Sequence, residues 1–142
     1  MMRAPELQVF LDAAEAALQQ SCLQESAAWS AAGRVFDRCR ARVGGTGTAR
    51  PARLPVCDWI APALSAATRR RDVADALAAL QGRLEWKRRA SADPADARFW
   101  EGHANAMICG PGGLELRDDL WIGVTVMAPG VTYVDHDHPP EE

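Results

Sequence analysis

The last ten residues of the 142-residue chain, YVDHDHPPEE, hold the side chains with the clearest chemistry. One residue separates His136 from His138, and Glu142 lies four residues after the second histidine. Side chains alternate between the two faces of an extended segment, so these three groups are expected to point the same way. Two imidazoles and a carboxylate suit a divalent transition metal, with zinc, iron and manganese as the leading candidates. The sequence therefore predicts a metal site made of these residues.

A second interpretation of the same residues is an unordered acidic tail that contains two histidines by chance. A bare H-x-H pair indicates little, but Gly130 before it and Glu142 after it strengthen the metal interpretation. Spacing alone leaves both interpretations open.

The secondary structure that must position this segment is predicted to change from helices to strands near residue 92. Before it, apolar residues recur at intervals of three and four, which predicts about four helices. The predicted helices start near Pro5, Ser26, Asp58 and Asp72. Asp72 is expected to be an N-cap, and the apolar side of the fourth helix is expected to include Leu84.

The second and fourth predicted helices carry further expectations. The second is expected to end near Val43, before a glycine- and proline-rich segment, 44–55, that is interpreted as a loop. The fourth is expected to continue to Trp86 along its apolar side.

After residue 92 the pattern predicts strands. Segment 103–113 is expected to be a short strand closed by a glycine-rich turn, and 119–130 is the clearest strand of the chain. Its two faces carry Trp121, Gly123, Thr125 and Met127 on one side and Ile122, Val124, Val126 and Ala128 on the other. Because both sets are largely apolar, we expect a barrel or sandwich whose other face packs on helices. The predicted fold class is α+β, with a helical region at 1–92 and the start of the β-structure at 93–142, together forming one structural domain.

Composition indicates a soluble cytoplasmic protein. Apolar residues make up 48% of the chain and charged residues 25%, with a net charge of −3. Basic runs are short, so no nucleic-acid surface is expected, and no apolar run approaches the roughly 20 residues of a membrane span. Acids at Glu6, Asp12 and Glu15 interrupt the apolar segment of a signal peptide. A homodimer is left open.

The four cysteines are widely spaced and form no C-x-x-C pair. We expect them to be buried and reduced. They are Cys22, Cys39, Cys57 and Cys109.

The terminal motif G-x5-H-x-H-x3-E, from Gly130 to Glu142, resembles the first metal motif of the cupin superfamily. The longer stretch from Ala95 to Glu142 is similar to the bacterial dimethylsulfoniopropionate (DMSP) lyases of the cupin type. Segment 54–64, LPVCDWIAPAL, and the helices before it also look like the N-terminal helical region of that family. The resemblance covers most of the chain, and its strongest part is the last 48 residues.

The resemblance implies a fold, a reaction and a set of site residues. It implies an incomplete cupin β-barrel and a metal-dependent lyase that cleaves DMSP, a small-molecule substrate, into dimethyl sulfide and acrylate. His138 and Glu142 match family metal ligands, and His136 matches a histidine that either binds the metal or lines the substrate pocket. Tyr133 matches a pocket tyrosine that orients the substrate or helps in proton transfer. Trp121 is a weaker substrate-binding candidate, because a sulfonium cation favours aromatic faces.

The chain departs from the family pattern at its end. Family members carry a tyrosine two residues past the position of Glu142 and a further metal-binding histidine later. We therefore expect the chain to be an N-terminal fragment without lyase activity of its own. His103, outside the motif, is expected to be structural. The alternatives are a cupin metalloprotein that acts on another small carboxylate and a non-enzymatic helical interaction domain.

Overall fold

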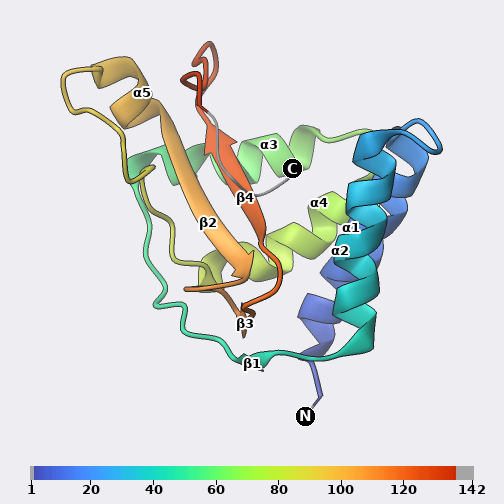
Figure 1. Ribbon diagram of the computed structural model, residues 1–142. Helices are drawn as coiled ribbons and strands as arrows, with labels where there is room; N and C mark the ends of the chain where they lie inside the picture. The colour runs from blue at the N-terminus through green and yellow to red at the C-terminus, as the bar shows by residue number, and fades with distance from the viewer. Residues whose placement is uncertain (1, 137–142) are drawn as a thin grey trace.

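The computed structural model describes residues 2–136 and has an α+β fold, as predicted. Its α-helices and four-stranded mixed sheet are drawn in Figure 1. The helices are α1 (Pro5–Ser21), α2 (Ala27–Ala41), α3 (Ile60–Ala66), α4 (Arg71–Leu80) and α5 (Ala97–Gly102), with 3-10 turns η1 (Pro55–Trp59) and η2 (Gln81–Arg83). The strands are β1 (Gly45–Thr46), β2 (His103–Cys109), β3 (Glu115–Leu116) and β4 (Ile122–Met127).

The sheet has the strand order β1-β3-β2-β4. β2 and β4 form an antiparallel ladder that extends from the pair His103 and Met127 to the pair Cys109 and Ile122. β3 lies parallel to β2, and β1 lies antiparallel to β3. In Figure 1 the ribbon of β2 and β4 crosses in front of α3 and α4, while α1 and α2 stand to one side. Within the described residues the sheet is open, and no closed barrel is formed.

The two faces of the β2–β4 ribbon have different surroundings. Ala104, Ala106 and Ile108 of β2 and Val126 of β4 belong to the core that the helices cover. The alternating residues, such as Asn105, lie on the opposite face, because successive strand side chains point to opposite sides. The alternation of the two residue sets along β4 is as predicted, but the expected burial of both faces is wrong for the described residues. Gly123 and Thr125 are exposed, because the helical core packs on the opposite face only.

One core joins the helical region to the sheet. It contains apolar residues of α1, α2 and α4 together with residues of β2 and β4. Leu80, Leu84 and Ile108 are fully buried within it. The helices and the sheet therefore stabilise each other through shared apolar burial.

Helix α2 largely follows the prediction. Its N-cap Ser26 accepts a hydrogen bond from the backbone N–H of Trp29, and the helix ends at Ala41, two residues before the predicted end at Val43.

Helix α4 differs from the prediction at both ends. It begins at Arg71, and its N-cap position is Arg70 in the left-handed conformation, with φ of 51°, so the N-cap assignment of Asp72 was wrong. It ends at Leu80, and Leu84 and Trp86 lie in an extended segment rather than on the helix. Both residues are buried there, and a short buried extended segment can repeat the apolar spacing of a helix.

Several short elements were not predicted. Helix α5 starts after Asp96, whose carboxylate accepts a hydrogen bond from the N–H of Phe99. Strands β1 and β3 have two residues each, and β1 lies in the segment interpreted as a loop. Two glycines allow this pairing, because an added Cβ would lie 2.2 Å from Leu116 O at Gly44 and 2.2 Å from Leu114 O at Gly47.

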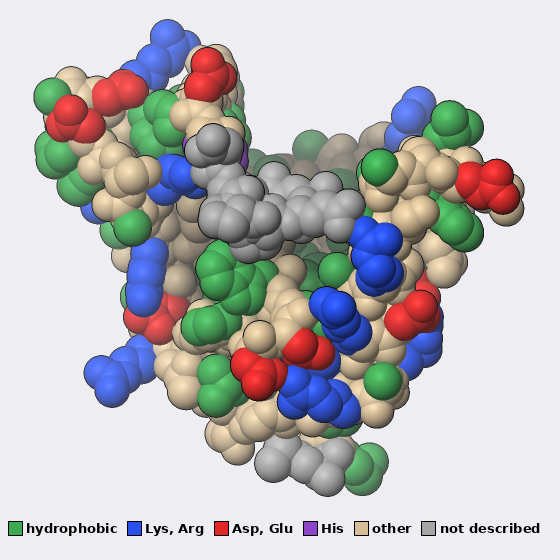
Figure 2. Space-filling view, in the orientation of Figure 1, with side chains coloured by type: hydrophobic (Ala, Val, Ile, Leu, Met, Phe, Trp, Pro, Cys, Tyr) green, Lys and Arg blue, Asp and Glu red, His purple; other side chains and the backbone are tan. Residues whose placement is uncertain are grey.

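The surface charges, the helices and the cysteines can be compared with the expectations from composition. Basic and acidic side chains lie next to one another on the face drawn in Figure 2. Within residues 2–136, no helix combines the length and apolar character needed to span a bilayer. All four cysteines are free thiols; three are buried as predicted, and Cys22 is half-buried.

Candidate functional site

Tyr133 lies against the face of the β2–β4 ribbon that points away from the core. The chain reaches this place after β4 through a turn in which Val131 N–H bonds to Ala128 O at 3.2 Å. Gly130 has φ of 76° in that turn, a conformation that glycine adopts at little cost. Val131 then packs so closely on Gly102 that an added Cβ there would lie 2.5 Å from it. These contacts hold the segment that carries Tyr133 next to the start of β2.

The hydroxyl group of Tyr133 has a defined partner on the ribbon. Asn105 Nδ2 donates a hydrogen bond to it over 2.9 Å. Asn105 Oδ1 in turn accepts a hydrogen bond from the hydroxyl of Thr125 at 2.7 Å. Asn105 and Thr125 are directly paired across β2 and β4. The three side chains therefore form a short hydrogen-bonded chain along one face of the sheet.

Aromatic rings and a cation surround the ring of Tyr133. Phe99, His103 and His136 meet it edge-on, with ring centroids 5.1, 5.9 and 5.2 Å away. The guanidinium carbon of Arg89 lies 5.9 Å from its centroid, within the range of a cation–π contact. The C-terminal segment, α5 and β2 thus converge on this tyrosine.

His103 has a structural role in this cluster. Its side chain is fully buried and stacks on Phe99, with ring centroids 3.7 Å apart. Its Nδ1 contacts Phe99 O, and its Nε2 accepts a hydrogen bond from the backbone N–H of Arg89 at 2.9 Å. Because both ring nitrogens have protein partners, neither has a lone pair left for a metal. This agrees with the structural role expected from the sequence.

Among the predicted metal ligands, His136 is the one within the described residues; His138 and Glu142 lie outside them. His136 is exposed, and its Nδ1 lies 3.0 Å from Val134 O. A metal-binding histidine commonly donates its second ring N–H to a backbone carbonyl, so this contact fits such a role. No group of three histidine, cysteine, aspartate or glutamate side chains suited to a metal occurs within residues 2–136. The three-ligand site stays a prediction.

A hollow of about 330 Å³ lies beside His136. This volume is within the range of pockets that hold small molecules. One arginine and three aspartates line it, and two of these aspartates also accept backbone hydrogen bonds, from Ala95 and Phe99. Its lining residues are Arg89, Ser91, Ala92, Asp93, Asp96, Phe99, Val134, Asp135 and His136.

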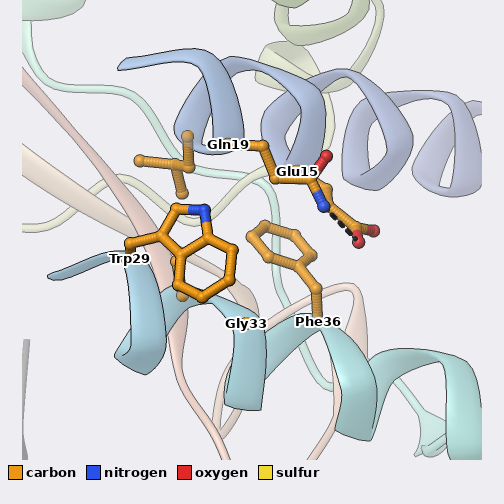
Figure 3. A pocket seen from close by; sticks show the side chains of 7 residues that line it. Glu15, Gln19, Trp29, Gly33 and Phe36 are labelled. Carbon is orange, nitrogen blue, oxygen red and sulfur yellow. Dashed lines mark hydrogen bonds between the residues drawn. The ribbon is translucent and has the colours of Figure 1, made fainter. Parts of the chain in front are cut away.

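A second hollow lies between α1 and α2 (Figure 3). The rings of Trp29 and Phe36 on α2 face Gln19 and Glu15 on α1, and Gln19 donates a hydrogen bond to Glu15. Its volume is about 50 Å³, well below that of a ligand pocket. We interpret it as a packing gap between the two helices.

Trp121 lies away from the Tyr133 cluster. It is 63% exposed and precedes β4 at the end of the ladder where Cys109 pairs with Ile122, whereas His103 is at the other end. The structure therefore does not bring Trp121 together with Tyr133 or His136. Its role in substrate binding stays a prediction.

Several residues of the Tyr133 cluster were not predicted as site residues from the sequence. Asn105 and Thr125 are polar residues in largely apolar strands, a signal that could have identified them. Their pairing depends on the strand register, which the sequence does not give. Arg89 and Phe99 come from a loop and from the short helix α5, and neither shows a periodic pattern.

A buried ionic network lies at the opposite end of β2, around β3. Arg3 contacts both carboxylate oxygens of Glu115, at 2.6 and 3.0 Å, and Arg117 contacts Glu115 at 3.1 Å. Burial alone would raise the pKa of Glu115, but hydrogen bonds from Arg3, Gly44 and Arg117 outweigh it and lower that pKa below its ordinary value. Asp119 accepts two hydrogen bonds from Arg117, which lower the pKa of Asp119 as well.

All these charges are paired within the network. The hydrogen bonds that Arg117 donates to Asp119 raise the pKa of Arg117. Carboxylates held ionised between guanidinium groups are poor proton donors, so we interpret the network as structural rather than catalytic.

The fold and the cluster define an α+β protein with a tyrosine–histidine site on the face of its sheet that points away from the core. Residues 30–142 match the family model described as dimethylsulfoniopropionate lyase. The match covers most of the chain, which therefore belongs to the dimethylsulfoniopropionate lyase family. Neither the search of curated proteins nor the search of solved structures gave a significant match.

Proposed function

We propose that this chain carries part of the active site of a metal-dependent lyase that cleaves DMSP into dimethyl sulfide and acrylate. The observation that carries the proposal is the family match over residues 30–142, which includes the whole Tyr133 cluster. The hollow beside His136 has a volume suited to a small substrate such as DMSP.

The reaction is a β-elimination. A base removes a proton from the carbon next to the substrate carboxylate, a double bond forms to the neighbouring carbon, and dimethyl sulfide leaves with the electron pair of the broken carbon–sulfur bond. Negative charge develops on the carboxylate as the proton leaves. A zinc, iron or manganese ion held by His136, His138 and Glu142 would supply Lewis-acid stabilisation of that charge.

The described residues would bind and orient the substrate. Tyr133 offers a hydroxyl group at the sheet face for a hydrogen bond to the substrate or for proton transfer. The rings of Tyr133, Phe99 and His136 lie at or beside the hollow, and aromatic faces attract a sulfonium cation. Asp135 adds a negative charge beside the same hollow. Trp121 is a weaker candidate, because it lies at the other end of the ladder.

The resemblance to the cupin-type lyases assigns the proton-abstracting tyrosine and a further metal-binding histidine to positions beyond Glu142. In this proposal the described sheet is the first part of a cupin β-barrel. The hydroxyl of Tyr133, which binds Asn105, orients the substrate or assists proton transfer in this proposal and is not the proton-abstracting base.

Dimethyl sulfide in the headspace above DMSP, measured by gas chromatography, tests the proposal. The 142-residue chain is compared with the product of the reading frame continued past codon 142, each with added zinc, iron or manganese. We expect dimethyl sulfide from the longer protein and none from the shorter one. Release by the shorter chain would overturn the fragment interpretation.

A longer protein that cleaves no DMSP would overturn the lyase proposal. A panel of other small carboxylates then tests the alternative that this is a cupin metalloprotein with a different substrate. The control variant Thr132→Val changes an exposed residue next to Tyr133 and is expected to keep full activity.

A further inference from the structure

We infer that Asn105 is a positioning residue that sets the direction of the Tyr133 hydroxyl group, with Thr125 holding Asn105 in place. The importance of this direction for the reaction rests on the proposed lyase function. The hydrogen bonds themselves are a property of the chain and can be tested without activity.

Asn105 occupies a firmly held backbone position. On one side β2 pairs with β4, where Asn105 lies opposite Thr125. On the other side Asn105 exchanges two backbone hydrogen bonds with Lys87, at 2.7 and 2.8 Å. A residue paired on both sides has little freedom to move, so its side chain starts from a fixed point.

The hydrogen bonds have a direction that leaves the phenol proton available. An asparagine amide has one acceptor oxygen and one donor nitrogen. The hydroxyl of Thr125 donates to the oxygen, which places the nitrogen toward Tyr133. The Tyr133 oxygen therefore accepts from Asn105, and its own proton stays available for another acceptor, such as a substrate. A reversed amide would consume that proton instead.

The aromatic neighbours fix the ring of Tyr133 independently of Asn105. Phe99, His103 and His136 meet it edge-on, and Arg89 lies near it. Loss of the Asn105 hydrogen bond therefore leaves the ring packed and changes the environment of the hydroxyl group. Substitutions at Asn105 and Thr125 thus test hydroxyl orientation apart from ring packing.

One substitution reverses the hydrogen bond between Asn105 and Tyr133, and another removes the hydrogen bond that orients the Asn105 amide. Asn105→Asp keeps the side-chain shape, but an ionised carboxylate only accepts, so Tyr133 would donate its proton to it. Thr125→Val keeps the shape of the threonine and removes the donor that orients the amide. Thr125→Ser keeps the hydroxyl and is the matched control, and Thr132→Val changes an exposed hydroxyl beside Tyr133.

Tyr133 is the single tyrosine of the chain, so tyrosine labelled with ¹³C at Cζ gives one assigned NMR resonance. We expect Asn105→Asp and Thr125→Val to move this resonance by more than its line width in the metal-free 142-residue protein. Thr125→Ser and Thr132→Val should leave it at the wild-type position. Circular dichroism checks that each variant is folded, and Thr125→Val carries the test if Asn105→Asp does not fold.

An unchanged resonance in folded Asn105→Asp or Thr125→Val protein overturns the inference. So does a Thr125→Ser protein that behaves like Thr125→Val. Because this readout needs no substrate or metal, it is independent of whether the lyase proposal holds.

The kinetic consequence is measured in the longer protein. A misdirected hydroxyl reduces the stabilisation of the transition state more than it reduces the affinity for substrate. Asn105→Asp should therefore lower kcat by about tenfold to a hundredfold with little change in KM. A rise in KM with unchanged kcat overturns the positioning role. If the NMR resonance moves as expected and no protein forms dimethyl sulfide, the orientation by Asn105 is supported and the lyase proposal fails.

Discussion

At the scale of single residues, Tyr133 is held by two separate sets of contacts. Its ring packs among Phe99, His103 and His136, and its hydroxyl binds Asn105, 28 residues away in the chain. Ring packing and hydroxyl chemistry can therefore be separated by substitution. This separation matters because the proposed substrate orientation or proton transfer by Tyr133 depends on the hydroxyl, whereas the attraction of a sulfonium cation depends on the ring.

Tyr133→Phe keeps the ring and removes the hydroxyl. We expect the free energy of unfolding to fall by about 1 kcal/mol, because one partly exposed hydrogen bond to Asn105 is lost. In the longer protein we expect dimethyl sulfide formation to fall by about a hundredfold, the typical contribution of a positioned proton-transfer group. Urea denaturation and headspace gas chromatography measure the two effects. A fully active Tyr133→Phe protein would contradict the role assigned to the hydroxyl.

The thiols differ in reactivity because the thiolate is the reactive form. Burial raises the pKa of Cys109 to about 12, and it also raises the pKa of Cys39, while Cys57 is buried and Cys22 is half-buried. With Ellman's reagent at pH 8, we expect one thiol to react quickly in the folded protein and all four after unfolding. Rapid reaction of two or more thiols in the folded protein would show that the core around Cys39 and Cys109 opens readily.

At the scale of elements, β2 organises the site. It begins directly after α5, so Phe99 on the helix and His103 at the start of the strand stack on each other. His103 also accepts the N–H of Arg89, which fixes the segment leading into the loop that lines the hollow. The strand thus connects the aromatic cluster, the hollow and the hydrogen bond from Asn105.

His103→Phe tests this junction, because phenylalanine keeps a ring of similar size for stacking on Phe99. It leaves the Arg89 N–H and the Phe99 carbonyl without their partner, and each unsatisfied buried group costs about 1–3 kcal/mol. We expect the free energy of unfolding to fall by about 2–4 kcal/mol in urea denaturation. Met107→Leu in the same strand is the control and should cost less than about 1.5 kcal/mol. An equal effect of both variants would argue against the structural role of His103.

Some elements could be predicted from the sequence because their patterns are long. The periodicity of α1 and α2 and the alternation in β4 each extend over several residues, and the burial of Leu7, Phe10 and Leu11 and of Phe36 and Cys39 agrees with them. The end of α4 could not be predicted, because Leu84 and Trp86 repeat a helical spacing although they lie in an extended segment. Their backbone groups bond to Ala52, and the next residue, Lys87, pairs with Asn105. Two-residue strands such as β1 depend on distant partners and have no pattern of their own.

The candidate site was predictable in its residue types and not in its contacts. Tyr133 and His136 carry chemistry in their own side chains and stand in a recognisable motif. Asn105, Thr125 and Arg89 join the site through strand register and loop path, which the sequence does not determine.

At the scale of the whole molecule, the buried ionic network fastens distant parts of the chain to one another. Arg3 before α1 binds Glu115 on β3, and Arg117 binds the backbone carbonyls of Arg38 and Arg42 at the end of α2. The side chains of Arg3, Glu115 and Arg117 are nearly inaccessible to solvent. Removing one member therefore leaves buried charges without a partner, which is far more costly than losing a surface ion pair.

The network makes the stability of the protein depend on pH in a defined direction. Because the folded-state pKa of Glu115 lies below its ordinary value of 4.5, its carboxylate stabilises the fold at neutral pH, and this contribution is lost as the pH falls below about 4.5. Asp119 acts in the same direction. Glu115→Gln should lower the free energy of unfolding by about 3–5 kcal/mol at pH 7, because Arg3 loses its buried counter-charge and Arg117 loses one of its two carboxylate partners.

The difference between wild type and Glu115→Gln should shrink as both proteins are taken from pH 5 to pH 3, since protonation of Glu115 removes the same charge in the wild type. Urea denaturation at a series of pH values measures it. Asp58→Asn is the matched control, because Asp58 is 84% exposed and forms a surface ion pair with Arg53 at 3.2 Å. Its removal should leave stability nearly unchanged at every pH. A constant difference between wild type and Glu115→Gln down to pH 3 would mean that packing rather than charge is what Glu115 contributes.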